Sequence, residues 1–321
     1  MIRVSDYPIN KDRLEKLDKL VNEIYRPNWE RLIENEKLYE PINGAPIGQF
    51  ISLTHIFALH SAVIQKDFAL SRKWFYLSDL GRIRRYAEYK KDASSTVFGY
   101  LPNLWFFLSD ANHLYTHFSQ MRHPDEEYLE TKAKWISYQL FRLFQESLVN
   151  NWVAVRAIIA KVDAREKYKK EIWLQERLRF YKALSNESPD AVESSLAQIL
   201  SVKSTKKSNK DFKDIALGNF MCNPGMWYSK LAWICGHQIE IEHPLIVSEL
   251  LPVQPLSSYD NPYSFLIDPV VEETSILRYG ASHESHEVER HNQMVFQAKY
   301  HNSLKSKNKL YNLFNKLRRN R

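Results

Sequence analysis

Hydrophobic residues recur at spacings of three and four along most of the chain, which is the period of an amphipathic helix. In the N-terminal half, the predicted helices cover Leu14–Ile24, Phe50–Val63, Leu70–Ile83, Leu101–Phe118 and Tyr128–Val149. The first is expected to end before Pro27, because a proline inside a helix removes a hydrogen bond and clashes with the preceding turn. The last two are rich in aromatic residues that would fill a core.

A pair of helices joined by a short turn is the clearest local unit. Helical spacing runs from Tyr168 to Leu184 and again from Ala191 to Leu200. Ser188 is a favourable N-cap, and Pro189 suits the first helical position, where a missing N–H costs nothing. The unit resembles one repeat of a helical-repeat protein, but the chain has no strict internal period. The predicted fold class is therefore all-α, an irregular stack of antiparallel helix pairs.

Residues 203–210 contain no apolar side chain, which predicts a polar surface linker. The linker would separate a helical body, residues 1–202, from a C-terminal helical subdomain, residues 211–304. In that subdomain a helix is predicted from Met226 to Cys235, with Gly236 as its stop.

An ordered loop with several prolines is predicted over residues 237–270. The segment Gln238–Glu242 alternates apolar and charged residues, which indicates a short extended piece. The prolines between Pro244 and Pro269 then exclude a long helix.

The composition supports helices and gives no sign of an active site. Only 8 of the 321 residues are glycine, and nucleotide-binding loops and tight hairpins depend on glycine. The chain also lacks GxGxxG, GxxxxGK[ST] and GxSxG motifs. We therefore expect neither an enzyme nor a bound cofactor.

Positive charge is concentrated at the C-terminal end. The segment Lys299–Arg321 has a net charge of +8, whereas the whole chain has +7, so the remaining residues are nearly neutral. Residues 305–321 form a predicted basic amphipathic tail, with an apolar stripe made by Leu310, Leu313, Phe314 and Leu317. Two interpretations are open: the tail binds nucleic acid or an anionic membrane, or it packs its stripe on the body.

The cysteines and the N-terminal segment indicate a protein of the cytoplasm. Cys222 and Cys235 match no zinc-binding or CxxC spacing, so two reduced thiols are expected, with a disulfide as the alternative. The residues after Met1 lack the apolar run of a signal peptide.

Two groups of histidines are candidate reactive sites. The segment His283–His291 places histidines three and five residues apart rather than the four of HExxH, so a weak metal site and a solvated helix start are both compatible with it. His237 and His243 flank the extended piece, but no nucleophile or carboxylate pair accompanies them in sequence. A structural role is the simpler interpretation of these two, and no metal site is predicted.

The stretch from Trp227 to Leu266 combines a helix stop, an extended turn and a loop marked by prolines. Its distinctive residues are Leu231-Ala232-Trp233, Gly236, the run from Ile239 to Ile246, Leu250-Leu251-Pro252 and Tyr263-Ser264-Phe265-Leu266. This stretch resembles the C-terminal region of the immunity protein 49 family, which is encoded beside bacterial polymorphic and secreted toxins. Residues 180–184 and 190–192 are similar to the middle region of that family. The positions taken as characteristic are Trp227, Trp233, Gly236, Pro244, Pro252 and Phe265.

A second group is also similar: the two-part helical immunity proteins paired with PoNe-type DNases, which share an aromatic-rich helical body ending in a Pro-Tyr loop. Either resemblance implies a cytoplasmic, non-catalytic, all-α protein. It would bind a cognate toxin, a type VI secretion, Rhs or other polymorphic-toxin effector, and occlude the toxin's active site. Because inhibitors of nucleases often present acidic surfaces and this body is nearly neutral, an acidic effector or one held by apolar contacts fits better.

The predicted partner contacts are the loop residues Tyr259, Asp260, Asn261 and Tyr263. Aromatic and amide side chains on an ordered loop suit an interface. The alternative is that these side chains anchor the loop to the body. The competing function is binding of nucleic acid or an anionic membrane through Lys299–Arg321, and a hydrolase that uses His283–His291 comes third.

Overall fold

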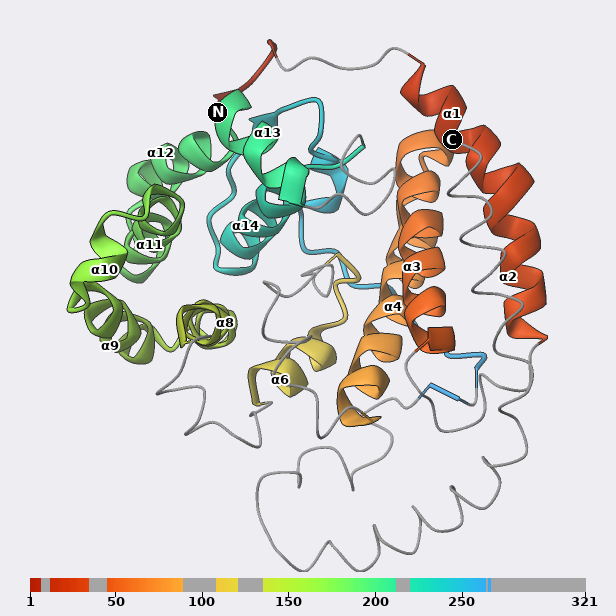
Figure 1. The fold of residues 1–321 in the computed structure, drawn as a ribbon, viewed down its shortest axis with the longest axis horizontal. Helices are drawn as coiled ribbons and strands as arrows, with labels where there is room; N and C mark the ends of the chain where they lie inside the picture. The colour runs from red at the N-terminus through yellow and green to blue at the C-terminus, as the bar shows by residue number, and fades with distance from the viewer. Residues whose placement is uncertain are drawn as a thin grey trace, which may run out of the picture.

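The computed structural model describes residues 1–6, 12–34, 45–88, 108–120, 135–211, 220–263 and 265–266. Within these residues the fold is all-α, as predicted, with a single two-stranded sheet. Helices α1 to α4 lie along one side of the molecule, helices α8 to α12 form an arc on the other, and α14 lies between them (Figure 1).

The N-terminal helical segment continues through its proline. It consists of α1 (Arg13–Leu20), a π-helical turn (η1, Val21–Tyr25) and α2 (Arg26–Ile33). The prediction that this helix ends before Pro27 is wrong. The wide π turn comes directly before Pro27, so the proline avoids the interior of a regular α-helix. Buried Trp29 then packs against Phe50, with ring centroids 5.2 Å apart, and this contact holds α2 on the body.

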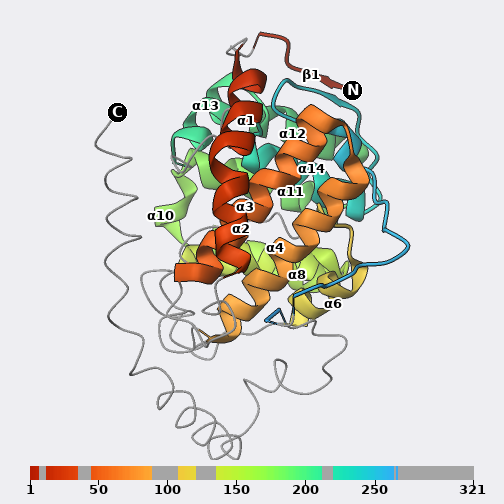
Figure 2. The ribbon, with the colours of Figure 1, turned by 90° about the vertical axis from the view of Figure 1, so that its right-hand side faces the viewer.

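A long apolar helix lies beneath this segment, as Figure 2 shows. α3 (Ala45–His60) is extended by a second π turn (η3, Ser61–Gln65) and packs against α4 (Phe68–Glu88). Both helices agree with the predicted pattern. Among the described residues, Pro46–Gln65 is the one helix long and apolar enough to cross a membrane, with a mean hydropathy of 1.5. Because 72% of that window is buried inside the fold, it has the properties of a core helix.

The turn before α6 departs from the predicted pattern. A helix was expected over Leu101–Phe118, but in the described part of that range α6 (Asn112–Gln120) begins only after a turn at 108–111. Asp110 has a φ of 59°, in the left-handed region that breaks a helix. The helical prediction is therefore wrong for 108–111, where buried polar contacts fix the backbone.

The arc consists of α8 (Trp135–Leu148), α9 (Trp152–Asp163), α10 (Glu166–Lys169), α11 (Ile172–Ser185) and α12 (Pro189–Ile199). α8 pairs with α9 and α11 with α12, while α9 also contacts α11. The predicted pair of helices is confirmed as α11 and α12, with Pro189 in the first turn of α12. The first helix does not begin at Tyr168 as predicted, because Tyr168 belongs to the separate helix α10. Ser188 occupies the N-cap with an extended backbone, although its side chain makes no capping hydrogen bond.

The predicted polar linker is instead a helix, α13 (Val202–Asp211). The run was predicted as a polar surface linker, and it differs from that in being helical and in burying one polar residue; the division of the chain at this run stays a prediction. Thr205 is fully buried, and its hydroxyl donates to the Leu200 carbonyl at 3.2 Å. Ser201 Oγ accepts a hydrogen bond from Ser204 N–H in the first turn. One apolar core runs from Ile2 to Leu266, so buried residues before and after 203–210 belong to the same core.

α14 (Asn223–Ile234) begins three residues before the predicted start at Met226. Its first turn lies very close to neighbouring side chains, because a Cβ on Gly225 would come within 2.5 Å of Leu200 Cδ2. Gly236 follows the helix with a φ of 88°, so its predicted role as a stop is confirmed.

The extended piece after α14 completes a small parallel sheet. β2 (Ile241–Glu242) pairs with β1 (Ile2–Arg3), with Ile2 opposite Ile241. After a short 3₁₀ turn (η6, Ser248–Leu250), the chain is irregular as far as the described residues reach. This agrees with the predicted loop.

Candidate functional site

Three buried charged side chains meet beneath the C-terminal loop. Asp110 and Lys230 are fully buried, and Arg72 is 4% exposed. Arg72 Nε lies 2.8 Å from Asp110 Oδ2, and Lys230 Nζ lies 2.5 Å from Asp110 Oδ1. The three residues come from α4, from the turn before α6 and from α14, so the cluster joins segments far apart in sequence. We call it the buried charge cluster.

The buried charge cluster also binds the backbone of the loop. Lys230 Nζ donates to the carbonyls of Leu250, at 2.9 Å, and Pro252, at 3.0 Å. Arg72 Nη2 donates to the Glu249 carbonyl at 3.3 Å, and Gln254 N–H donates to Asp110 Oδ2 at 3.2 Å. Irregular backbone that leaves water needs such partners, because it has no helix or sheet to satisfy it. The side chains therefore fix residues 249–254 in place.

Burial shifts the pKa of Lys230, Tyr115 and Asp79. It lowers the pKa of Lys230 to about 8, and the Asp110 carboxylate opposes that shift. The Tyr115 hydroxyl donates to Asp110 Oδ1 at 3.3 Å. Burial, together with the nearby Asp110 carboxylate, raises the pKa of Tyr115. Asp79, two turns after Arg72 on α4, is fully buried, and burial raises its pKa. Titratable side chains are thus held in a site closed to solvent, where burial favours their neutral forms.

The predicted partner residue Tyr259 is used inside the molecule. Its hydroxyl donates to the Ser109 carbonyl at 2.7 Å and accepts from Leu256 N–H at 3.0 Å. Its ring lies 4.9 Å from the ring of Tyr76 on α4. Burial raises the pKa of Tyr259, which keeps this hydroxyl protonated as a donor.

Asn261 and Tyr263 are engaged in the same way. Asn261 accepts from Tyr263 N–H at 3.1 Å and donates to the Leu266 carbonyl at 3.0 Å. The Tyr263 ring contacts Trp29 at 5.9 Å between centroids. Asp260 alone of the four is exposed. The geometry supports the anchoring alternative for three of these residues, and their contact with a partner stays a prediction.

The six positions that the sequence analysis takes as characteristic of the expected family belong to the scaffold. Trp227 is buried and stacks on Tyr228, and Phe265 is buried with its carbonyl accepting from Arg84. Trp233 Nε1 donates to the Ile239 carbonyl at 3.2 Å. Gly236 ends α14, the Pro244 carbonyl accepts from Arg13 at 3.0 Å, and Pro252 contacts Lys230 as described. Their side chains and backbones shape the loop and the core.

The histidines near the loop have structural surroundings. His243 is buried, and its Nδ1 accepts from Leu245 N–H at 2.9 Å. Burial lowers the pKa of His243 to about 4, and burial also lowers that of His237. Cys222 and Cys235 are both free thiols, as expected. His243 thus holds the turn after β2.

Several predicted features lie outside the described residues: the segment His283–His291, the tail at 305–321, and the part of the loop after residue 266. Within the described part of the chain, no group of three or more His, Cys, Asp or Glu side chains is placed to hold a metal ion.

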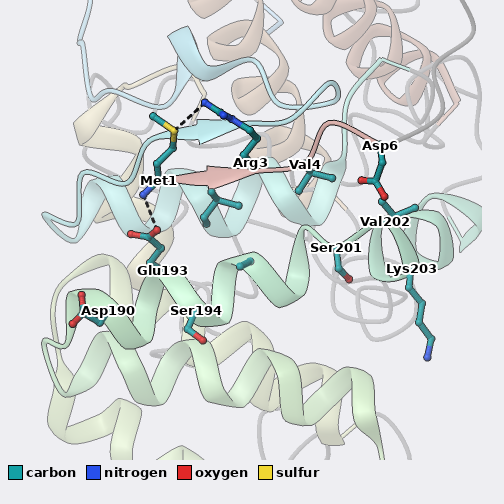
Figure 3. A pocket seen from close by; sticks show the side chains of 12 residues that line it. Met1, Arg3, Val4, Asp6, Asp190, Glu193, Ser194, Ser201, Val202 and Lys203 are labelled. Carbon is teal, nitrogen blue, oxygen red and sulfur yellow. Dashed lines mark hydrogen bonds and ion pairs between the residues drawn. The ribbon is translucent and has the colours of Figure 1, made fainter.

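A groove of about 830 Å³ lies between the N-terminal strand and the arc (Figure 3). Its walls come from β1, from α12 and from the start of α13, and they include both acidic and basic side chains. The amino group of Met1 bridges one side to Glu193 at 2.7 Å. The lining contains two serines, three carboxylates and Lys203, but neither histidine nor cysteine.

The sequence reasoning missed the buried charge cluster, because its members are dispersed along the chain. One signal was present. Lys230 interrupts the apolar run Met226–Ile234, and a lysine inside an otherwise buried helix needs an anionic partner. The spacing of residues in the sequence does not identify that partner.

Comparison with protein-family models, curated proteins and solved structures finds no match to this chain.

Proposed function

We propose that this protein is an immunity protein that binds a cognate bacterial toxin and neutralises it by occluding the toxin's active site. The toxin would be a type VI secretion, Rhs or other polymorphic-toxin effector, and the complex would form in the cytoplasm of the producing cell. The proposal is motivated by the resemblance of the stretch from Trp227 to Leu266 to the immunity protein 49 family.

One structural observation carries it furthest: the buried charge cluster fixes an irregular loop on a helical body. Occlusion requires a surface whose shape is set before the partner arrives, since ordering a loop on binding weakens affinity. Lys230 and Arg72 supply that order from beneath, through hydrogen bonds to three loop carbonyls. The residues that resemble the family thus build a rigid support.

The experiment is co-expression of the full chain with the toxin encoded by the adjacent gene. The expected result is restored growth of the toxin-expressing cells, together with a complex of the two purified proteins that survives gel filtration. A toxin variant without its active-site residue serves for purification. Absence of growth protection, with no binding at micromolar concentrations, would overturn the proposal.

The second candidate function is binding to nucleic acid or to an anionic membrane through Lys299–Arg321, which carries a net charge of +8. Phosphate contacts release counterions, so affinity should fall steeply as salt is raised. Deletion of residues 299–321 should abolish binding to duplex DNA and to vesicles containing anionic lipid. Equal binding by the truncated and full-length chains would refute this function.

A further inference from the structure

Positive charge in the helical body gathers on three consecutive helices. Between Arg156 and Lys182 the chain carries nine Lys or Arg residues and four Asp or Glu residues, a net charge of +5. Outside this segment and the tail, the remaining residues have a net charge of −6. We call the segment, which spans α9, α10 and α11, the basic hairpin. The near-neutral total of the body therefore hides a separation of charge.

The basic hairpin is on the outside of the fold. α10 lies at the periphery of the arc in both views (Figure 1, Figure 2). Lys167, Lys169, Lys170 and Arg179 are all exposed. On α11, Ile172 and Arg179 are seven residues apart, so they lie on the same face of the helix.

Two large apolar side chains are also exposed on these helices. Ile172 is 73% exposed and Val153, at the start of α9, is 74% exposed. Two aromatic rings support the cations: Lys167 Nζ lies 4.7 Å from the centre of the Tyr168 ring, and the Arg177 guanidinium lies 4.9 Å from the ring of Trp173. Arginine, aromatic and aliphatic side chains with a charged rim are typical of protein interfaces.

We infer that the basic hairpin is the docking surface for an acidic face of the toxin. This inference rests on the proposed function and adds to it the contact surface and the charge of the partner. The loop supplies a surface of fixed shape, but its side chains Tyr259, Asn261 and Tyr263 are already bound within the chain, so the basic hairpin would supply the charged contacts.

A protein partner fits the basic hairpin better than a nucleic acid does. Glu166, Glu171 and Glu176 lie among its cations, and they would repel a phosphate backbone. Some of the cations are also paired, as Lys182 is with Asp163 at 2.7 Å. Exposed Ile172 and Val153 would gain from apolar contacts that a phosphate backbone does not offer.

The test compares two triple charge reversals with equal change in net charge. The first, Lys167→Glu with Lys170→Glu and Arg179→Glu, alters the basic hairpin. The matched control, Lys16→Glu with Lys19→Glu and Lys73→Glu, alters exposed lysines of α1 and α4. Association with the toxin encoded by the adjacent gene is measured at about 50 and about 300 mM salt, where electrostatic attraction is screened to different extents.

The hairpin variant should associate at least about ten-fold more slowly than wild type and lose its dependence on salt, because steering by complementary charge acts on the association rate. The control should stay within about two-fold of wild type. Ile172→Asp probes the apolar part independently and should weaken binding mainly through faster dissociation. Circular dichroism of each variant checks that it is folded.

The outcomes separate the two proposals. If wild type does not bind the toxin, the proposed function fails and this inference fails with it. If wild type binds and both triple variants bind equally well, the inference alone is overturned. It is overturned too if the hairpin reversal abolishes binding to a DNA duplex while toxin binding is unchanged.

Discussion

Replacement of Lys230 by methionine tests whether the buried charge cluster holds the loop. Methionine keeps the length and most of the volume of the side chain, so the packing of α14 is conserved. It removes the ion pair with Asp110 and the hydrogen bonds to the Leu250 and Pro252 carbonyls. The variant therefore tests the charge and the hydrogen-bond donors of Lys230 separately from its packing.

The size of the effect follows from what remains after the substitution. Removing one partner of a buried ion pair typically costs about 3–5 kcal/mol, because the other charge is left without compensation. Here Asp110 keeps Arg72 at 2.8 Å, Tyr115 at 3.3 Å and Gln254 N–H at 3.2 Å. We therefore expect the lower end, a loss of about 3 kcal/mol in the free energy of unfolding.

Urea unfolding followed by tryptophan fluorescence measures this loss. Lys182→Met is the matched control, because Lys182 also forms an ion pair, with Asp163, but both side chains are more than a third exposed. An exposed pair contributes about 0–1 kcal/mol, so this control should unfold close to wild type. Limited proteolysis should show faster cleavage near residues 249–254 in Lys230→Met only.

If the free energy of unfolding of Lys230→Met lies within about 1 kcal/mol of wild type and its loop resists proteolysis equally well, the buried charge cluster does not hold the loop. The same result would remove the structural support that the proposed function takes from the loop. A loss of stability as large in Lys182→Met would show that the effect is not specific to buried charge.

Three further predictions concern single residues. Since burial lowers the pKa of His243 from 6.5 to about 4, unfolding free energy should fall as pH drops from 6.5 to 4, and His243→Asn should remove up to about 3 kcal/mol of that fall in urea titrations. Gly225→Ala should lower the free energy of unfolding by about 1–3 kcal/mol, because the new Cβ would lie 2.5 Å from Leu200 Cδ2. Gly236→Ala would meet no atom within 4 Å, so only its positive φ should lower that free energy, by about 1 kcal/mol. Urea unfolding measures both. Burial raises the pKa of Cys235 to about 12. Its thiol should therefore react with an aromatic disulfide reagent far more slowly in the folded protein than in urea. The absorbance of the released thiol measures both rates, and equal rates would contradict this prediction.

The periodic hydrophobic pattern was enough to predict the fold class and most helices, because the buried apolar residues of these helices belong to one core and recur at helical spacing. It failed where tertiary contacts override local preference. Pro27 lies in a helix because a π turn precedes it and Trp29 packs on Phe50. The polar run after Ser201 is helical, with Thr205 buried, and one buried hydroxyl leaves no trace in a hydrophobic pattern.

The candidate site was less predictable, for a physical reason. Loop residues such as Tyr259 carry the same aromatic and polar groups whether they contact a partner or the body, so composition alone does not separate these roles. The hydrogen bond from Tyr259 to the Ser109 carbonyl links residues 150 positions apart. Asp110, Arg72 and Lys230 become a cluster only through the packing of three segments, and no spacing in the sequence encodes that.

The buried charge cluster and the basic hairpin divide two tasks between two parts of the molecule. A buried ion pair is weak support for overall stability, since its desolvation offsets its attraction, but it can select one position for the backbone that it binds. Lys230 can donate to the Leu250 and Pro252 carbonyls only when the loop is in register, so the cluster favours one loop conformation. The basic hairpin contributes exposed charge, which alters association rates and hardly alters folding. The two effects should therefore separate: Lys230→Met should lower unfolding free energy, and reversal of the hairpin charges should slow toxin association while stability stays near wild type.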